Sequence, residues 1–195
     1  GYYALKTTNG NGTTGSYNVA LGYSALSANT TGSFNVASGA NTLASNTSGN
    51  KNSAFGNQSL NQNTTGGNNV GFGFSSLYSV TTASDNTAIG TFSGSSLTTG
   101  ARNTFLGSYA GAYFSTEYSS AYNNTTGLNS VLIGYDVRPL ANGDDNEIVI
   151  SGYNGTPGTT PGTIGWGSHS TTIGNTKTQK SRLYGALTVV PNIAT

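Results

Sequence analysis

The sequence predicts an all-β chain that folds as a parallel β-solenoid, or β-roll, of 17-residue repeats. A short motif, Asn-x-small-x-Gly, recurs at a constant step, and large apolar residues recur at fixed places between its copies. Repetition at a fixed short period is typical of chains that stack one unit on the next. The motif recurs with a 17-residue step five times in succession, at Asn18, Asn35, Asn52, Asn69, Asn86 and Asn103.

The composition favours an ordered repeat over a disordered chain. Gly, Ser, Thr and Asn make up 108 of the 195 residues, and only 7% of residues are charged, against about 25% in an ordinary domain. Disordered chains usually combine high net charge with few aromatic residues, whereas this chain has a net charge of +1, 12 Tyr and 7 Phe. The weak charge argues against nucleic-acid binding, and no apolar run approaches the ~20 residues of a membrane span.

The repeat continues after an interruption. The next Asn is Asn129, which follows Asn103 after a 26-residue step, and Asn146 follows it after the usual 17-residue step. We therefore expect nine inserted residues and eight structural Asn in all. Two interpretations of these Asn remain open. They form a ladder in which each side-chain amide bonds the next, or each one tolerates the left-handed backbone of a turn.

Each unit is interpreted as two short strands and two turns. The motif supplies the first strand, the second lies around a Leu four residues after the Gly, and Asn-Thr-Thr-Gly corners close the unit. The Leu residues are Leu26, Leu43, Leu60 and Leu77, and Gly1–Leu5 is the tail of an earlier unit. Without an initiator Met, the chain is expected to be a piece of a longer or processed protein.

Alternation within the first strand predicts two different faces. Two residues after the Asn the side chain is small, as at Ala37, and three residues after it the side chain is mostly large and apolar, as at Phe72. We expect the small face to close the roll and the large face to pack against neighbouring chains. An intertwined or side-by-side homotrimer satisfies both faces.

The motif resembles the head repeats of trimeric autotransporter adhesins, which run Asn-Ser-Val-Ala-Ile-Gly. Asn86-Thr-Ala-Ile-Gly90 and Asn129-Ser-Val-Leu-Ile-Gly134 are close to it. The resemblance covers about residues 1–150 and implies a left-handed, trimeric parallel β-roll on a bacterial surface. The 17-residue unit is longer than the adhesin repeat and is similar to repeats in bacterial surface fibres and phage tail fibres.

The remaining residues, 151–195, are expected to be a capping or transition segment that leads toward a downstream domain. Asn146-Glu-Ile-Val-Ile150, the stretch from Gly165 to Asn175, and Arg182-Leu-Tyr-Gly-Ala-Leu-Thr-Val189 follow in order. That order resembles the segment before the endosialidase-type intramolecular chaperone of phage tail fibres and spikes. The chaperone's catalytic Ser and Lys have no matching motif in this sequence.

Two breaks in the repeat are candidate contact sites. The first is a Tyr-rich loop at about 108–123 and the second, 153–167, holds the single Trp. Loops on a rigid scaffold often carry recognition, and the alternative is that the Tyr rings cover a neighbouring subunit and that Trp166 packs at the junction. The candidate contacts with a host glycan or protein are Tyr109, Tyr113, Phe114, Tyr118, Tyr122 and Trp166.

No catalytic residue, metal ligand or cofactor is expected. Asp144, Asp145 and Glu147 cluster beside Asn142-Gly143, where Asp is common in turns, and His169 has no Cys or second His to share a metal. The sequence therefore predicts a structural and adhesive segment of an extracellular fibre, of phage or bacterial origin. The alternatives are a monomeric ice-binding solenoid with stacked corner Thr and, less favoured, a glycan-cleaving spike.

Overall fold

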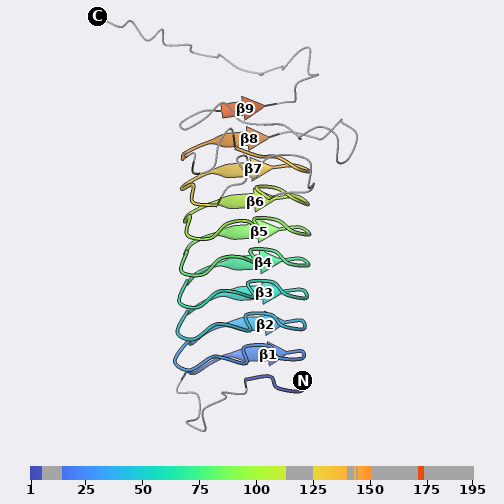
Figure 1. Cartoon of the computed structure of the whole chain (residues 1–195), viewed down its shortest axis with the longest axis vertical. Helices are drawn as coiled ribbons and strands as arrows, with labels where there is room; N and C mark the ends of the chain where they lie inside the picture. The colour runs from blue at the N-terminus through green and yellow to red at the C-terminus, as the bar shows by residue number, and fades with distance from the viewer. Residues whose placement is uncertain (6–14, 113–124, 140–142, 144, 151–170, 174–195) are drawn as a thin grey trace, which may run out of the picture.

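The computed structural model describes residues 1–5, 15–112, 125–139, 143, 145–150 and 171–173. Its strands form one parallel sheet in which each strand pairs with the next along the chain (Figure 1). The strands are β1 (Val19–Leu21), β2 (Val36–Ser38), β3 (Ser53–Phe55), β4 (Val70–Phe72), β5 (Thr87–Ile89), β6 (Thr104–Leu106), β7 (Val131–Ile133), β8 (Ile148–Ile150) and β9 (Thr171–Ile173). The predicted parallel β-solenoid is confirmed.

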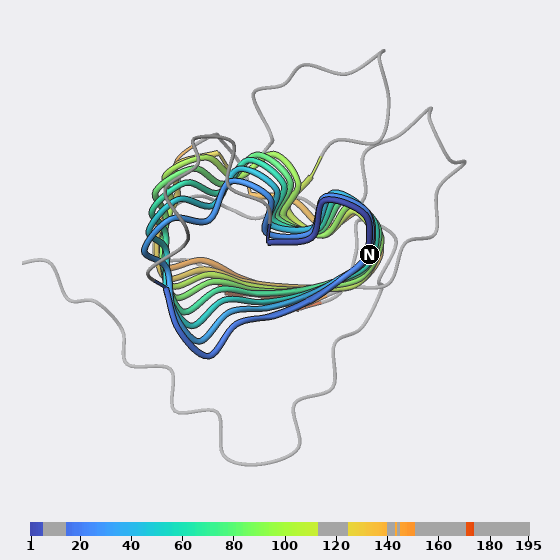
Figure 2. The ribbon, with the colours of Figure 1, turned by 90° about the horizontal axis from the view of Figure 1, so that it is seen from below.

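Equivalent residues of successive turns lie directly over one another. Val19 pairs with Val36, Ala20 with Ala37 and Leu21 with Ser38, and β2 to β6 keep the same 17-residue offset. Figure 2, viewed along the stack, shows the turns superposed. We number the places in each turn 1 to 17 from the residue before each strand, so that Asn18 and Asn35 occupy position 1.

Only the predicted first strand of each unit is a strand. The prediction of a second strand around the Leu was wrong, because positions 7 and 9 hold left-handed residues such as Ser24 (φ 54°) and Leu26 (φ 51°). Position 17 is also left-handed, as at Phe34 (φ 60°). These residues reverse the chain within one turn, and they keep bonds to neighbouring turns, such as Leu26 N–H to the Thr42 carbonyl at 3.0 Å.

The pairing of β6 with β7 corrects the expected register after the insertion. Thr104 pairs with Val131, so Ser130, and not Asn129, occupies position 1, and Glu147 occupies it in the next turn instead of Asn146. Asn129 and Asn146 lie at the left-handed position 17, with φ of 57°. The step from Asn103 to Ser130 is 27 residues, so the insertion has ten residues rather than nine.

The sheet extends past residue 150. β9 pairs in parallel with β8, and Ile148 lies opposite Thr171. One strand of the expected capping segment therefore belongs to the same sheet. The part of the chain that the structure describes contains no helix with the length and hydropathy of a membrane span.

The core is one narrow column between the sheet and the left-handed segment. In the first turns, small residues at position 3, such as Ala37 and Ala54, face fully buried Leu at position 9, including Leu43 and Leu60. In later turns, the large side chain lies at position 3 and the small residue lies at position 9. Phe105 is fully buried at position 3, and position 9 holds Gly94 and Gly111, where a Cβ atom would collide with the Phe105 ring.

A ladder of Asn side chains at position 1 runs through the stack. The Asn18 Oδ1 accepts the Asn35 backbone N–H at 2.9 Å, and the Asn35 Nδ2 donates at 2.8 Å to the carbonyl of Gly49, at position 15 of its own turn. The same bonds recur at Asn52, Asn69, Asn86 and Asn103. None of these six Asn has positive φ, so the ladder interpretation holds and the left-handed one does not.

A second, shorter ladder runs through buried Asn at position 12. The Asn46 Nδ2 donates to Asn29 Oδ1, and the Asn63 Nδ2 donates to Asn46 Oδ1, both at 2.9 Å. The next residue in this row is the fully buried Val80, which offers no donor, and the buried Asn63 Oδ1 has no hydrogen-bond partner. The ladder therefore ends on an unsatisfied oxygen.

This ladder end predicts unequal effects for one substitution at two neighbouring rungs. Asn63→Val moves the unsatisfied oxygen from Asn63 to Asn46 and leaves their number unchanged. Asn46→Val leaves the Asn63 oxygen unsatisfied and also removes the donor to Asn29. Because a buried unsatisfied polar group costs about 1–3 kcal/mol, Asn46→Val should lower the free energy of unfolding by about that much more than Asn63→Val. Urea unfolding measures both, and equal losses would contradict the ladder.

The exchanged core sizes predict a compensating pair. Gly94→Leu should destabilise the fold by about 1–3 kcal/mol through overpacking, although Leu occupies this position in preceding turns. A Cβ at Gly94 would lie 2.7 Å from the Phe105 ring, so adding Phe105→Ala in that background should recover part of the loss. A double-mutant cycle by thermal unfolding measures the coupling, and strict additivity would show that the two sites are independent.

Candidate functional site

Two surfaces of the stack are candidates for contact with other molecules. The first is the outer face of the sheet, formed by positions 2 and 4, which we call the outer sheet face. The second is a row of aromatic side chains at positions 6 and 7, which we call the aromatic edge. Both follow from the stacking, since any residue type that recurs at one position forms a line along the axis of the stack.

The outer sheet face is apolar and open. Position 3 points into the core, so positions 2 and 4 must point outward. Leu21 is 65% exposed and Phe72 is 56% exposed, and Phe55 packs against Phe72 with ring centroids 5.5 Å apart. Large apolar side chains that remain exposed on this face are Val19, Leu21, Phe55, Val70, Phe72, Ile89, Leu106, Ile148 and Ile150.

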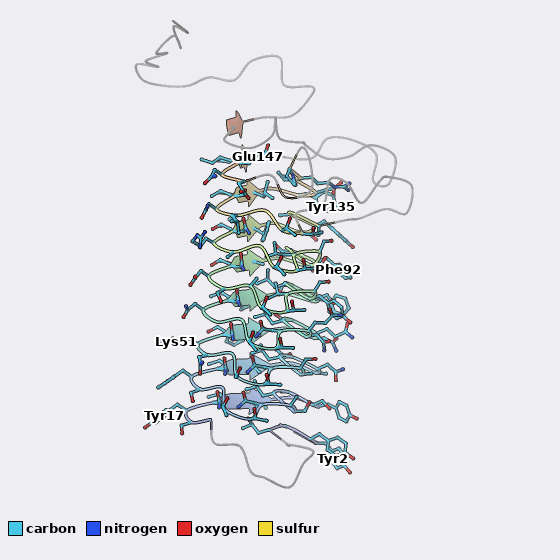
Figure 3. All side chains as sticks on the ribbon, turned by 60° about the vertical axis from the view of Figure 1, so that its left-hand side comes forward. Tyr2, Tyr17, Lys51, Phe92, Tyr135 and Glu147 are labelled. Carbon is cyan, nitrogen blue, oxygen red and sulfur yellow. The ribbon has the colours of Figure 1, made fainter. Side chains whose placement is uncertain are left out.

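The aromatic edge follows the strand at the next bend of the chain. Phe92 lies between Phe74, at a centroid distance of 5.1 Å, and Tyr109, which stacks on it at 5.2 Å. Tyr109 in turn contacts Tyr135 edge-on at 6.0 Å. Near the N-terminal end the row contains Tyr2, Tyr3 and Tyr23, and Figure 3 shows Tyr2, Phe92 and Tyr135 along the same side of the stack.

At the N-terminal end of this edge, neighbouring rings perturb the Tyr3 phenol. The pKa of the Tyr3 phenol is raised, first by a side-chain hydrogen bond with Tyr2, then by burial and by the nearby Tyr23. The Tyr3 phenol therefore favours the neutral form, and it presents a hydroxyl group and a ring face rather than a charge.

The sequence placed Tyr109 in the inserted loop, and the structure places it elsewhere. Tyr109 occupies position 7 of a regular turn, with φ of 59°, and the regular turn extends to Ala112. It therefore belongs to the aromatic edge. The other candidate contacts lie outside the described residues, namely Tyr113, Phe114, Tyr118, Tyr122 and Trp166.

Formal charge is confined to another corner. Between residues 15 and 112 the charged residues are Lys51, Asp85 and Arg102, and all three occupy position 17. Figure 3 shows Lys51 on the opposite side of the stack from Phe92. The outer sheet face and the aromatic edge of these turns therefore carry no charged side chain.

Buried ionic groups appear only further along the described stack. Arg138 takes the position 9 that Leu holds in earlier turns, and its Nε and Nη2 donate to Asp136 Oδ1 at 2.8 and 2.6 Å. Glu147, at position 1, is also fully buried. Asp145 Oδ1 accepts the Leu128 N–H of the preceding turn of the stack at 2.7 Å. Asp144 and His169 lie outside the described residues.

The corner Thr residues have a role within the stack. The hydroxyl of Thr30 donates to the Thr47 carbonyl at 2.9 Å, and Thr47 and Thr64 repeat this bond to the next turn. In the described ranges, no group of three or more His, Asp or Glu side chains lies together as a metal ion would require.

The buried ion pair predicts a contrast between single and double substitution. Asp136→Ser removes the carboxylate from a buried guanidinium and should cost about 3–5 kcal/mol. The double change Asp136→Ser with Arg138→Leu recreates the Ser75 and Leu77 pair of an earlier turn. The double variant should be at least as stable as the wild type. The reason is that the cost of desolvating two buried charges offsets much of the attraction between them. Thermal unfolding of the two variants measures this, and a double variant as unstable as the single one would contradict it.

Comparison of the chain with protein-family models, with curated proteins and with solved structures finds no match. The candidate surfaces therefore rest on the geometry of this chain. That geometry combines an in-register stack, an apolar outer sheet face and an aromatic edge that carries no charged side chain between residues 15 and 112.

Proposed function

We propose that this chain is a structural and adhesive segment of a trimeric extracellular fibre, a phage tail fibre or a bacterial surface adhesin. Its role is to hold attachment surfaces at a fixed distance from the particle or cell. The resemblance of the repeat to trimeric adhesin heads motivates the assignment. The observation that carries it is the outer sheet face.

Exposure of this face is unfavourable for a separate chain in water. Each fully buried large apolar side chain gains about 1.5–3 kcal/mol relative to the exposed state, and Leu21, Phe72 and Leu106 are three of several on the face. Contiguous apolar patches of this kind mark surfaces that other molecules cover. The chain's own described residues do not cover it.

A second and third copy of the chain are the partners that fit the face best. Strands of the stack advance by about 4.8 Å, and only a partner with the same rise can meet every rung in the same way. Copies related by rotation about an axis parallel to the stack keep like residues at the same height, so that Phe72 lies level with Phe72 of its neighbours. Such rotation closes into a ring of identical chains, as most homo-oligomers do.

The mass of the assembly in solution tests the proposal. Light scattering should give three times the 19.8 kDa of one chain. Phe72→Lys with Ile89→Lys should yield folded monomers, because charges on the outer sheet face would be desolvated at the interface. Circular dichroism confirms that the variant retains its sheet.

The matched control is Phe34→Lys, at position 17, where Lys51 is found one turn later. This variant also replaces an exposed ring with a charge, but away from the outer sheet face, and it should remain trimeric. A wild-type chain that is a stable monomer at micromolar concentration would overturn the trimer.

A further inference from the structure

A shallow groove lies beside the aromatic edge and spans three successive turns. Its volume is about 460 Å³, within the range of small-molecule sites. One side comes from positions 6 and 7 and the other from positions 10 and 11. The lining residues are Gln58, Phe74, Ser75, Tyr78, Ser79, Phe92, Ser95 and Ser96. Between the two sides, the chain at Ser76 and Leu77 is buried.

We propose that this groove binds an uncharged oligosaccharide. The inference rests on the proposed function, since it names the class of molecule to which the fibre attaches. It also places the contact on the regular turns, apart from the inserted loop that the sequence suggested. Three properties of the groove carry it: aromatic rings, hydroxyl groups and the absence of charge.

The rings supply flat apolar surface. Phe74 is 43% exposed, and its contact with Phe92 holds the two rings in a fixed relation across adjacent turns. Sugar rings present a face of C–H groups that packs against an aromatic ring, and rigid rings lose little entropy on binding. Tyr78 adds a third ring on the opposite side of the groove.

The remaining lining is polar but neutral. Ser hydroxyls donate and accept hydrogen bonds, as sugar hydroxyls do, and the Gln58 amide offers both functions. Ser79, Ser95, Ser96 and Gln58 line the groove beside the rings, whereas the hydroxyl of the buried Ser75 donates to Gln58 Oε1 at 3.4 Å. This combination of few rings and many hydroxyl groups matches a ligand that is apolar on its faces and polar on its rim.

The charge distribution selects among ligands. No Lys, Arg, Asp or Glu lines the groove, and the charged residues of these turns lie at position 17, on another corner. Phosphate polymers and uronic or sialic acid chains need cations that the groove lacks. A neutral glycan needs none. Because the lining includes no residue of the outer sheet face, trimer formation through that face leaves the groove open.

The repeat itself supplies variants that should fold. Position 6 holds Thr91 one turn after Phe74, so Phe74→Thr places a residue that the fold already accepts there. Position 7 is left-handed and holds Asn41 in an earlier turn, so Phe92→Asn suits the backbone. The control is Phe34→Asn at the left-handed position 17, where Asn68 is native, which removes an exposed ring from a different corner.

The test is a glycan array probed with the full chain, followed by titration of neutral hexasaccharides of glucose and N-acetylglucosamine and of a hexagalacturonate. We expect binding to at least one neutral probe and none to the acidic one. Phe74→Thr and Phe92→Asn should each weaken binding by about threefold to tenfold, and Phe34→Asn should leave it unchanged. The proposal that the groove binds a neutral oligosaccharide would be contradicted by any of three results. These are binding of the acidic probe alone, equal binding by all variants, and no binding to any neutral glycan.

The same samples separate this inference from the fibre assignment. Their masses are measured in parallel by light scattering. If the chain is a trimer that binds no neutral glycan, the glycan-binding proposal is wrong and the trimeric-fibre proposal still stands. If the chain is a monomer whose binding of neutral glycans depends on Phe74 and Phe92, the trimer proposal is wrong and the glycan-binding proposal still stands.

Discussion

The fold depends most directly on the side-chain amide at position 1. In Asn35 the amide nitrogen bonds the Gly49 carbonyl near the end of the same turn, and the Oδ1 bonds the backbone of Asn52 in the next turn. One buried side chain thus closes its own turn and also fixes the position of that turn relative to the next turn along the stack. A 17-residue turn without helices has little core, so this repeated polar bond gives it a unique geometry.

Closing so short a turn also requires a backbone that most residues disfavour. Leu26, Leu43 and Phe92 adopt left-handed φ near 50–55°, a conformation that local preferences give mainly to Gly and Asn. Hydrogen bonds to adjacent turns hold these residues in place, so the strain is offset by contacts distant in sequence. Here the propensity for strand around each Leu was misleading, because the cooperative stack overrides it.

Much of the architecture was predictable from the period, and the errors have identifiable causes. The in-register pairing was predictable from the constant 17-residue step. The small inner face of the first turns was predictable from the small residues that recur at position 3. The register prediction after the insertion failed because Asn129 has the residue type that starts the motif, whereas Ser130 has the correct spacing to Gly134. Counting back four residues from Gly134 identifies Ser130. The aromatic edge escaped sequence analysis because the spacing of Phe74 and Phe92 is one residue longer than the repeat, so their contact joins position 6 to position 7.

In-register stacking allows the length of the solenoid to change by whole turns. Each early turn touches only its two neighbours, so recombination between copies could delete or duplicate a unit and keep every ladder bond. The exchange of sizes around Phe105 sets a boundary to this freedom. A Cβ atom at Gly94 or Gly111 would collide with that ring, so the turns that hold Phe105 and these two glycines must be kept together. Solenoids of this kind that differ in length should therefore differ in the number of Leu-containing turns and share the turns around Phe105.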